Sequence, residues 1–281
     1  MTVAATETIE TPSGKGREGE NFPVGSFLIR PDLRAHVHAF YAFARAADDI
    51  SDHPLLEPDE KTARLDHFAA ILLGDARDDV ASAVGMRSSL RATGITPQHC
   101  LDLLTAFKRD AKQLRYRDWD DLMDYCRYSA SPVGRHVLAL HGIGETAWPA
   151  NDALCSALQV INHMQDCADD YAQLDRVYIP QDMLAASGAK TEDLAQRGSS
   201  PALRGTLDAM IVKLDAMMPE ARKLPRRVPD LRLKCETAVI WSLADSLIRL
   251  LRKRDPLRDH MKLSKPAVAR AAISGLARAW F

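Results

Sequence analysis

Apolar side chains recur at intervals of three and four residues along most of the chain, the spacing that places them on one face of an α-helix. Runs of β-branched residues are short, and no segment alternates apolar and polar side chains as a half-buried strand does. Helix-breaking residues such as Pro54, Gly94 and Pro180 separate the periodic segments. The pattern predicts helices over residues 31–50, 59–73, 79–93, 97–112, 119–130, 133–140, 151–174, 191–196, 201–224, 231–253 and 265–281.

The first twenty residues differ from the rest, because Thr, Glu and Gly dominate them and few apolar side chains occur. Such a segment cannot bury enough apolar surface to offset the entropy cost of ordering, so we predict a disordered polar tail over residues 1–20. Residues 21–281 show no composition change that would mark a linker, and they are long enough to bury one large core. We therefore expect an all-α protein with a single domain over residues 21–281, its helices bundled around a central cavity.

The charge of the chain is balanced, with 37 Lys and Arg against 38 Asp and Glu and a formal net charge of -1. No global field favours a nucleic acid, so any anionic ligand must be bound by a local site. Five scattered cysteines without a metal-binding spacing favour reduced thiols in a cytoplasmic compartment. No stretch of about 18 uncharged apolar residues occurs, so we expect a soluble protein or one that touches a membrane only at its surface.

The first candidate for chemistry lies at the end of the first predicted helix. Asp48 and Asp52 are four residues apart, which stacks their carboxylates on one helical face, and Arg45 and Tyr41 continue this face toward the N-terminus. Like charges at this spacing destabilise an isolated helix by about 0.2–0.5 kcal/mol, so the pair calls for a compensating partner. A bound cation would supply it.

A second carboxylate pair follows in the segment 151–174. Asp166 and Asp170 repeat the spacing of four residues, and Asn162 lies one turn before them. Apolar neighbours such as Ile161 and Met164 indicate that this face turns inward, where carboxylates are costly unless a cation neutralises them. Oxygen ligands without accompanying Cys or His suit Mg2+, which completes its shell with water and substrate phosphate. A solvated acidic helix face is the alternative for either pair alone, whereas the two together predict a magnesium-dependent diphosphate site.

These motifs resemble those of the squalene and phytoene synthase family of trans-isoprenoid synthases. The first aspartate-rich motif of that family is matched by Tyr41, Arg45, Asp48 and Asp52, and the second by Gln159, Asn162, Asp166 and Asp170. Further matches are Ser26-Phe27, Tyr125-Cys126-Arg127-Tyr128, Val133-Gly134 and Arg176-Val177-Tyr178-Ile179-Pro180. The resemblance implies the trans-isoprenoid synthase-like fold, a helical bundle whose central cavity holds a prenyl diphosphate.

Within the family, residues 21–24 and 125–134 are most similar to the bacterial hydroxysqualene synthases of squalene and hopanoid biosynthesis. For that group the implied reaction is the loss of diphosphate from presqualene diphosphate, rearrangement of the cation and its capture by water, which makes the enzyme a carbon-oxygen lyase. The resemblance implies Mg2+ ligands at Asp48, Asp52, Asp166 and Asp170, diphosphate contacts at Arg45 and Arg176, and catalytic roles for Tyr41, Tyr128 and Asn162, with both tyrosines facing the carbocation.

One segment departs from the family pattern. Residues 129–132 read Ser-Ala-Ser-Pro where the family commonly has a glycine. Because Pro132 restricts the residue before it and cannot continue a helix, we predict a helix break here. The break either exposes carbonyl groups that hold a water beside the cavity or is a plain interruption.

Two other functions stay open at this stage. A condensing transferase of the same family joins two prenyl diphosphates head to head with the same aspartates, so the motifs do not separate it from the lyase. A non-catalytic assembly factor of this fold is expected to lose carboxylates, whereas all four are present. The implied partners are presqualene diphosphate and the pathway enzymes that make it and reduce the product. Basic stretches at 222–227 and 252–254 suit contact with the inner membrane, although a solvated face is the more common reason for such stretches.

Overall fold

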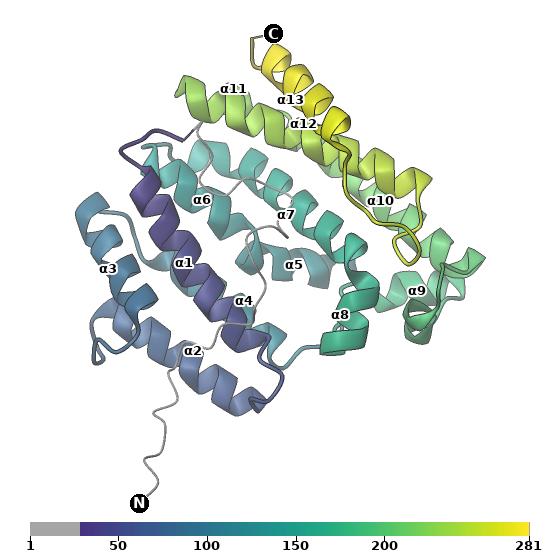
Figure 1. The fold of residues 1–281 in the computed structure, drawn as a ribbon, viewed down its shortest axis with the longest axis horizontal. Helices are drawn as coiled ribbons and strands as arrows, with labels where there is room; N and C mark the ends of the chain where they lie inside the picture. The colour runs from purple at the N-terminus through teal and green to yellow at the C-terminus, as the bar shows by residue number, and fades with distance from the viewer. Residues whose placement is uncertain (1–28, 281) are drawn as a thin grey trace, which may run out of the picture.

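The structure, a computed structural model, describes residues 29–280 and is built from packed α-helices (Figure 1). The predicted tail over residues 1–20 and the quoted segments 21–24 and 26–27 lie outside the described residues. The helices are α1 (Arg34–Ser51), α2 (Pro58–Leu73), α3 (Ala81–Thr93), α4 (Gln98–Asp110), α5 (Trp119–Ser129), α6 (Ser131–Leu140), α7 (Trp148–Gln165), α8 (Cys167–Leu174), α9 (Gln181–Ser187), α10 (Pro201–Ala221), α11 (Leu224–Arg227), α12 (Leu231–Lys253) and α13 (Lys265–Trp280), with short 3-10 helices η2 (Glu145–Ala147) and η3 (Thr191–Ala195).

The prediction of an all-α protein is confirmed, but one predicted helix is divided in the structure and two short helices were not predicted. The segment 151–174 is not one helix, because the chain leaves helical geometry at Asp166 (φ -102°, ψ 6°) and divides into α7 and α8. The short helices α9 and α11 were missed, since segments this short show no clear apolar period. The predicted break before Pro132 is confirmed: α5 ends at Ser129, and Pro132 stands in the first turn of α6, where its missing N–H costs nothing.

The starts of α5 and α12 are fixed locally by side-chain caps. The carboxylate of Asp118 accepts a hydrogen bond from the amide of Asp121 (2.8 Å) at the start of α5. The carboxylate of Asp230 accepts from the amide of Leu233 (2.8 Å) at the start of α12 in the same way. Each cap satisfies an amide that has no partner within its own helix.

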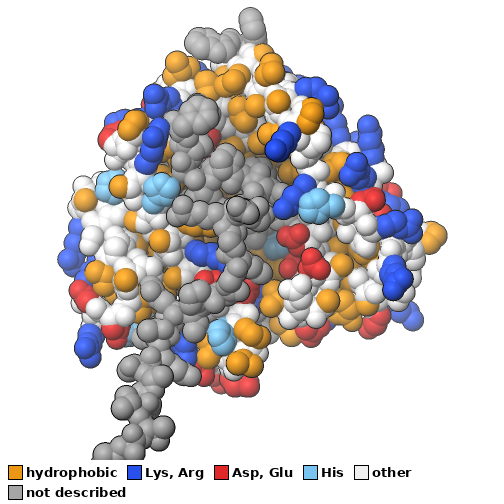
Figure 2. All heavy atoms as spheres, viewed as in Figure 1, with side chains coloured by type: hydrophobic (Ala, Val, Ile, Leu, Met, Phe, Trp, Pro, Cys, Tyr) orange, Lys and Arg blue, Asp and Glu red, His pale blue; other side chains and the backbone are white. Residues whose placement is uncertain are grey.

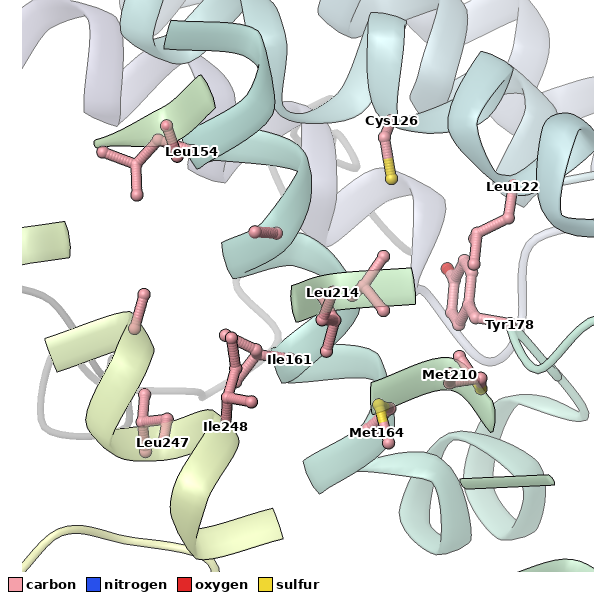
Figure 3. Packing of buried hydrophobic residues seen from close by; sticks show 14 of the residues in the cluster. Leu122, Cys126, Leu154, Ile161, Met164, Tyr178, Met210, Leu214, Leu247 and Ile248 are labelled. Atoms are coloured by element: carbon pink, nitrogen blue, oxygen red, sulfur yellow. The ribbon is translucent and has the colours of Figure 1, made fainter. Parts of the chain in front are cut away.

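The core has two main parts, and α7 runs through the centre of the larger one. Figure 3 shows Leu154 and Ile161 of α7 among side chains from the neighbouring helices, with Met210 on α10 and Ile248 on α12. The smaller part lies between α1, α2, α3 and α4. The aspartates of α1 and of the α7–α8 junction are therefore carried by helices that the core holds in place.

Among the described helices, none is both long and apolar enough to cross a lipid bilayer. Along one edge of the bundle, α12 and α13 run side by side (Figure 1).

Candidate active site

An apolar cavity of about 460 Å³ opens among α1, α6, α7 and α12. Its walls are mainly aliphatic and aromatic, with Phe40 on α1, Leu138 on α6, Leu154 on α7 and Ile240 on α12. A cavity of this size and lining suits a long hydrocarbon chain. The predicted central cavity is thus present in the fold.

The polar side chains of this cavity lie mostly along one face of α7. Asn151, Cys155, Gln159 and Asn162 line the cavity at intervals of three or four residues. The Nδ2 of Asn151 donates to the carbonyl of Ser131 at 3.3 Å, and this bond holds the start of α6 against α7. Asn162 is the member of this row that belongs to the second aspartate motif, so the cavity reaches that motif directly.

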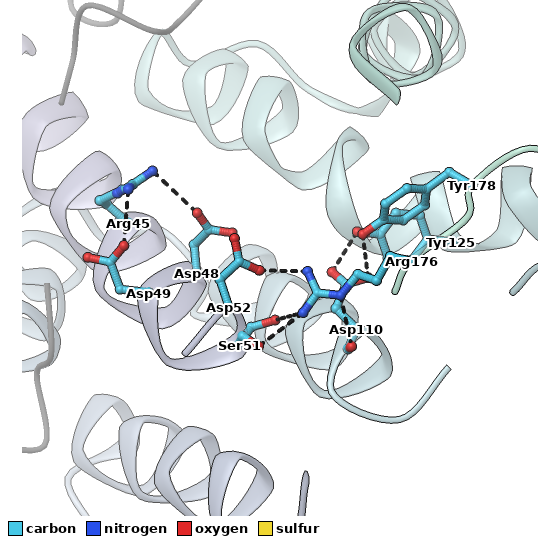
Figure 4. A network of polar contacts seen from close by, with 9 residues as sticks. All are labelled: Arg45, Asp48, Asp49, Ser51, Asp52, Asp110, Tyr125, Arg176 and Tyr178. Atoms are coloured by element: carbon cyan, nitrogen blue, oxygen red, sulfur yellow. Dashed lines mark hydrogen bonds and ion pairs between the residues drawn. The ribbon is translucent and has the colours of Figure 1, made fainter. Parts of the chain in front are cut away.

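The carboxylates of the first motif stand at the C-terminal end of α1, as Figure 4 shows. Arg45 lies one turn before them and contacts Asp48 at 3.4 Å and Asp49 at 3.1 Å. Tyr41, one turn earlier, lines the cavity. The predicted order along this face therefore holds in the structure, with the aromatic ring at the cavity and the cation beside the carboxylates.

Arg176 connects the two aspartate motifs. Its guanidinium donates to the Asp52 carboxylate at 2.6 Å, to the carbonyl of Ser51 at 3.0 Å and to the carbonyl of Asp110 at 3.1 Å (Figure 4). Its backbone amide donates to the carbonyl of Asp170 at 3.1 Å. Arg176 as a whole residue is only 6% exposed, so a buried cation links the end of α1 to α8.

A buried carboxylate that the sequence analysis missed lies behind Arg176. The carboxylate of Asp110 accepts hydrogen bonds from the hydroxyl groups of Tyr125 (2.7 Å) and Tyr178 (2.9 Å) (Figure 4). Burial raises the pKa of Asp110 to about 6, although Arg176 and the two hydroxyl groups act in the opposite direction. Tyr125 and Tyr178 were part of the quoted motifs, whereas Asp110 ends a helix and gave no signal of its own.

An aromatic stack supports this network from the side of α7. The ring of His163 lies 3.5 Å from the ring of Tyr178, centroid to centroid, with an angle of 12° between the planes. Burial, followed by the charge of Arg176, lowers the pKa of His163 to about 3, so the stacked ring is neutral near pH 7. The stack fixes Tyr178, which in turn holds Asp110.

The carboxylates of the second motif were predicted to face the interior, and the structure does not bury them. Asp166 is exposed and Asp170 half-buried, so this row of oxygen ligands runs from the cavity at Asn162 to the surface at Asp166. The amide of Asp170 still donates to the carbonyl of Asp166 at 2.8 Å, which keeps the two residues one turn apart across the helix break. Asp166 and Asp170 therefore lie outside the described lining of the cavity, beyond Asn162, and together with Asp48 and Asp52 they are called the rim.

The two tyrosines with predicted catalytic roles, Tyr41 and Tyr128, lie in different surroundings. Tyr41 lines the cavity. Tyr128 packs against the core, with the guanidinium of Arg127 5.6 Å from its ring centroid, and it does not belong to the described lining of the cavity.

The carboxylates fit magnesium in their chemistry. Within residues 29–280, no three His, Cys, Asp or Glu side chains are grouped closely enough to hold a metal ion by themselves. Mg2+ in phosphate-handling sites commonly uses one or two carboxylates and takes its other ligands from water and phosphate oxygens. Asp48, Asp52, Asp166 and Asp170 offer such carboxylates at the rim, and they bring no sulfur or nitrogen ligand that would favour another metal.

The all-helical bundle around an apolar cavity has the fold of the trans-isoprenoid synthases, as comparison with solved structures shows. The crystal structure of a squalene synthase from Alicyclobacillus acidocaldarius superposes with a TM-score of 0.72 at 31% identity, covering 82% of this chain and 87% of that one. A dehydrosqualene synthase with 21% identity shares the fold, with a TM-score of 0.71 over 87% of this chain and 86% of that one.

Residues 16–267 match the family model described as squalene/phytoene synthase, and the chain belongs to this family of enzymes. The hydroxysqualene synthase of Rhodopseudomonas palustris is 47% identical over 258 residues, which cover 92% of this chain and 88% of that protein. The hydroxysqualene synthase of Zymomonas mobilis is 44% identical over 268 residues, or 94% and 90% of the two chains. A phytoene synthase from Pseudescherichia vulneris is more distant, at 28% identity over 84% of this chain and 76% of that protein.

Proposed function

We propose that this protein is a hydroxysqualene synthase, which converts presqualene diphosphate and water into hydroxysqualene and diphosphate. The observation that carries the proposal is the similarity of nearly the whole chain to enzymes of that name, at 47% and 44% identity. The apolar cavity beside two aspartate motifs supports it, because the substrate combines a long hydrocarbon with a diphosphate. In this reaction the carbon-oxygen bond to diphosphate breaks and a bond from carbon to the water oxygen forms, so the activity is that of a lyase.

The rim would bind the diphosphate. Asp48 and Asp52 on α1, with Asp166 and Asp170 at the α7–α8 junction, would hold Mg2+ together with the phosphate oxygens. Bound Mg2+ supplies positive charge that stabilises the diphosphate as it leaves. Arg45 and Arg176 add fixed positive charge on the same side and would contact the diphosphate oxygens directly.

The cavity would hold the hydrocarbon and the cation. Its aliphatic walls exclude bulk water, so the cation rearranges before it is captured. The ring of Tyr41 offers a π-face to positive charge, an interaction of about 0.5–2 kcal/mol. Asn162 lies between the rim and the cavity, and its amide would orient the departing diphosphate or the incoming water. Tyr128, which packs outside this lining, would act through the position of α5.

A condensing transferase of the same family is the second candidate, and the similarity to a phytoene synthase favours it. It would join two prenyl diphosphates in the same cavity and with the same aspartates. The condensing transferase is the weaker candidate, because the phytoene synthase is less similar to this chain than the hydroxysqualene synthases are.

The proposed lyase would work between two other enzymes. One must supply presqualene diphosphate by condensation, and another must reduce the product alcohol. Since both substrate and product are long hydrocarbons, we propose that the protein works in the cytoplasm at the surface of the membrane.

Incubation of the purified protein and Mg2+ with presqualene diphosphate, and separately with farnesyl diphosphate, tests the proposal. Mass spectrometry of the extracted products should find a C30 alcohol from presqualene diphosphate and no product from farnesyl diphosphate alone. Incorporation of 18O from labelled water into the alcohol would identify water as the nucleophile. Consumption of farnesyl diphosphate would instead assign the condensing activity, and inertness toward both substrates would refute both proposals.

A further inference from the structure

An ordinary surface helix buries its larger apolar side chains, whereas the C-terminal helix α13 exposes them. Its buried face is made of small residues, since Ala271 is 5% exposed and a Cβ at Gly275 would lie 2.7 Å from the carbonyl oxygen of Ala238. The larger aliphatic side chains point outward: Ile273 is 68% exposed, Val268 41% and Leu276 40%. The backbone of α13 thus packs closely on α12 and presents an apolar ridge to the surroundings.

The Lys, Arg, Asp and Glu residues of the C-terminal segment have one sign of charge. Residues 260–281 contain Lys262, Lys265, Arg270 and Arg278 and no Asp or Glu. Figure 2 shows hydrophobic side chains gathered at the top of the view, where Figure 1 places α13, with Lys and Arg side chains beside them. An exposed apolar ridge with basic flanks is the pattern of a helix that lies in a membrane interface.

Two grooves beside α13 extend the positive surface onto the neighbouring helices. One is lined by Arg222, Arg226 and Arg278 around Trp241, with the Arg278 guanidinium 4.9 Å from the Trp241 ring centroid. The other is lined by Arg249, Lys253, Arg270 and Arg278, and its single acidic residue, Asp245, is paired with Arg249. Both grooves suit anionic headgroups beside an inserted apolar ridge.

We propose that α13 docks the protein onto an anionic lipid surface, with Val268, Ile273 and Leu276 in the acyl boundary and the flanking Arg and Lys side chains at the headgroups. Charge favours lipid over a second copy of the chain as the occupant. A two-fold interface through this ridge would bring the same arginines of both copies together, which repel each other. The proposal locates the membrane contact suggested above, but it does not depend on the catalytic activity.

Vesicle flotation with the full chain tests this docking without any substrate. Vesicles of phosphatidylglycerol mixed with phosphatidylcholine are compared with pure phosphatidylcholine vesicles, for the native protein and for Ile273→Ser with Leu276→Ser. The matched control is Val212→Ser, because Val212 is an equally exposed aliphatic side chain (66%) that belongs to α10 and not to α13. Thermal unfolding and light scattering check that each variant is folded and report its oligomeric state.

The native protein and the Val212→Ser control should float with the anionic vesicles, and the double variant should bind at least about tenfold more weakly. Arg270→Gln should weaken binding, and added salt should weaken binding of the native protein. The proposal would be overturned if the native protein does not bind anionic vesicles, or if the double variant binds them as well as the control does. A native dimer that the double variant dissociates would overturn it too, since the ridge would then join two copies.

A turnover assay with substrate dispersed in detergent separates this proposal from the catalytic one. The α13 side chains do not belong to the described lining of the cavity, so the double variant should turn over at the native rate. A protein that floats with vesicles but lacks turnover would refute the catalytic proposal alone.

Discussion

Arg176 and Asp52 are 124 residues apart in the sequence, and a hydrogen bond of 2.6 Å joins them in the fold. Both side chains are nearly buried, at 7% and 10% exposure. The same guanidinium donates to Ser51, and the Arg176 amide donates to the carbonyl of Asp170. One arginine therefore sets how the end of α1 faces α8, and with it the relative position of the two aspartate motifs.

The first prediction concerns this link. Arg176→Lys keeps the positive charge but cannot reach Asp52, Ser51 and Asp110 at once, because an ammonium lacks the planar fork of a guanidinium. We expect turnover of presqualene diphosphate to fall by roughly 10²-fold, since the proposed diphosphate site loses its alignment, and the free energy of unfolding to fall by about 1–3 kcal/mol.

The matched control is Arg115→Lys. It alters a more exposed ion pair with Asp175, the residue that directly follows α8 and precedes Arg176. That pair is worth at most about 1 kcal/mol, so both turnover and thermal unfolding should stay close to native. Equal losses in the two variants would mean that the Arg176 link does not position the site.

Local parts of the site could be predicted from the sequence, and distant parts could not. The row from Tyr41 through Arg45 to Asp48 depends only on helical spacing, and the structure has it. The network around Asp110 joins residues 15 to 68 positions apart, which no periodicity encodes. Recognition of the motifs named Arg176 as a diphosphate contact, but its link to Asp52 emerged only from the folded chain.

The helix break at Asp166 shows a similar limit. Residues 159–170 contain no Gly or Pro, so the sequence favours an unbroken helix. Tertiary packing overrides that preference and turns Asp166 to the surface, while Asn162 stays at the cavity. The row of oxygen ligands, which was predicted to face the interior, therefore reaches the surface at Asp166.

The second prediction tests the rim. Asp166→Asn removes the negative charge of a proposed magnesium ligand but keeps the shape of the side chain, so turnover should fall by roughly 10²–10³-fold while the thermal midpoint stays within a few degrees. The apparent affinity for Mg2+ should fall as well. Asp169→Asn is the control, because Asp169 is also exposed and stands in the first turn of α8. Native turnover of Asp166→Asn at limiting Mg2+ would refute the role of this carboxylate.

The third prediction concerns the contact between α6 and α7 at the cavity wall. A Cβ at Gly134 would meet the Asn151 side chain and lie 2.7 Å from the Cys155 sulfur. Gly134→Ala should therefore push the two helices apart and lower the free energy of unfolding by about 1–3 kcal/mol, as measured by urea denaturation.

Gly85→Ala provides the comparison, since a Cβ at that helical position has no atom within 4 Å apart from the nearby backbone of its own helix and its two neighbours in the chain. It should leave stability unchanged or raise it by up to about 1 kcal/mol, because Ala favours helix. If the two variants unfold at the same urea concentration, the close approach at Gly134 is not a constraint.

The fourth prediction concerns acid stability and His136. The ring of His136 stacks on the ring of Phe40, with 4.2 Å between the ring centroids. Neither ring nitrogen of His136 has a hydrogen-bond partner among the described residues. Burial, followed by the charges of His99 and His36, lowers the pKa of His136 to about 3 from 6.5. The unfolded chain therefore binds more protons here between about pH 6.5 and 3, so this group makes the fold less stable as the pH falls through that range.

His136→Phe removes this titration and keeps a flat ring against Phe40. At pH 7 its stability should be close to native, whereas at pH 4.5 it should exceed native by about 2–3 kcal/mol, since each unit of pKa difference is worth about 1.4 kcal/mol. Urea denaturation at both pH values measures the difference, with His260→Phe as a control at an exposed position. If His136→Phe shows the same gain at pH 7 as at pH 4.5, the gain comes from packing, and the buried histidine is not a source of acid sensitivity.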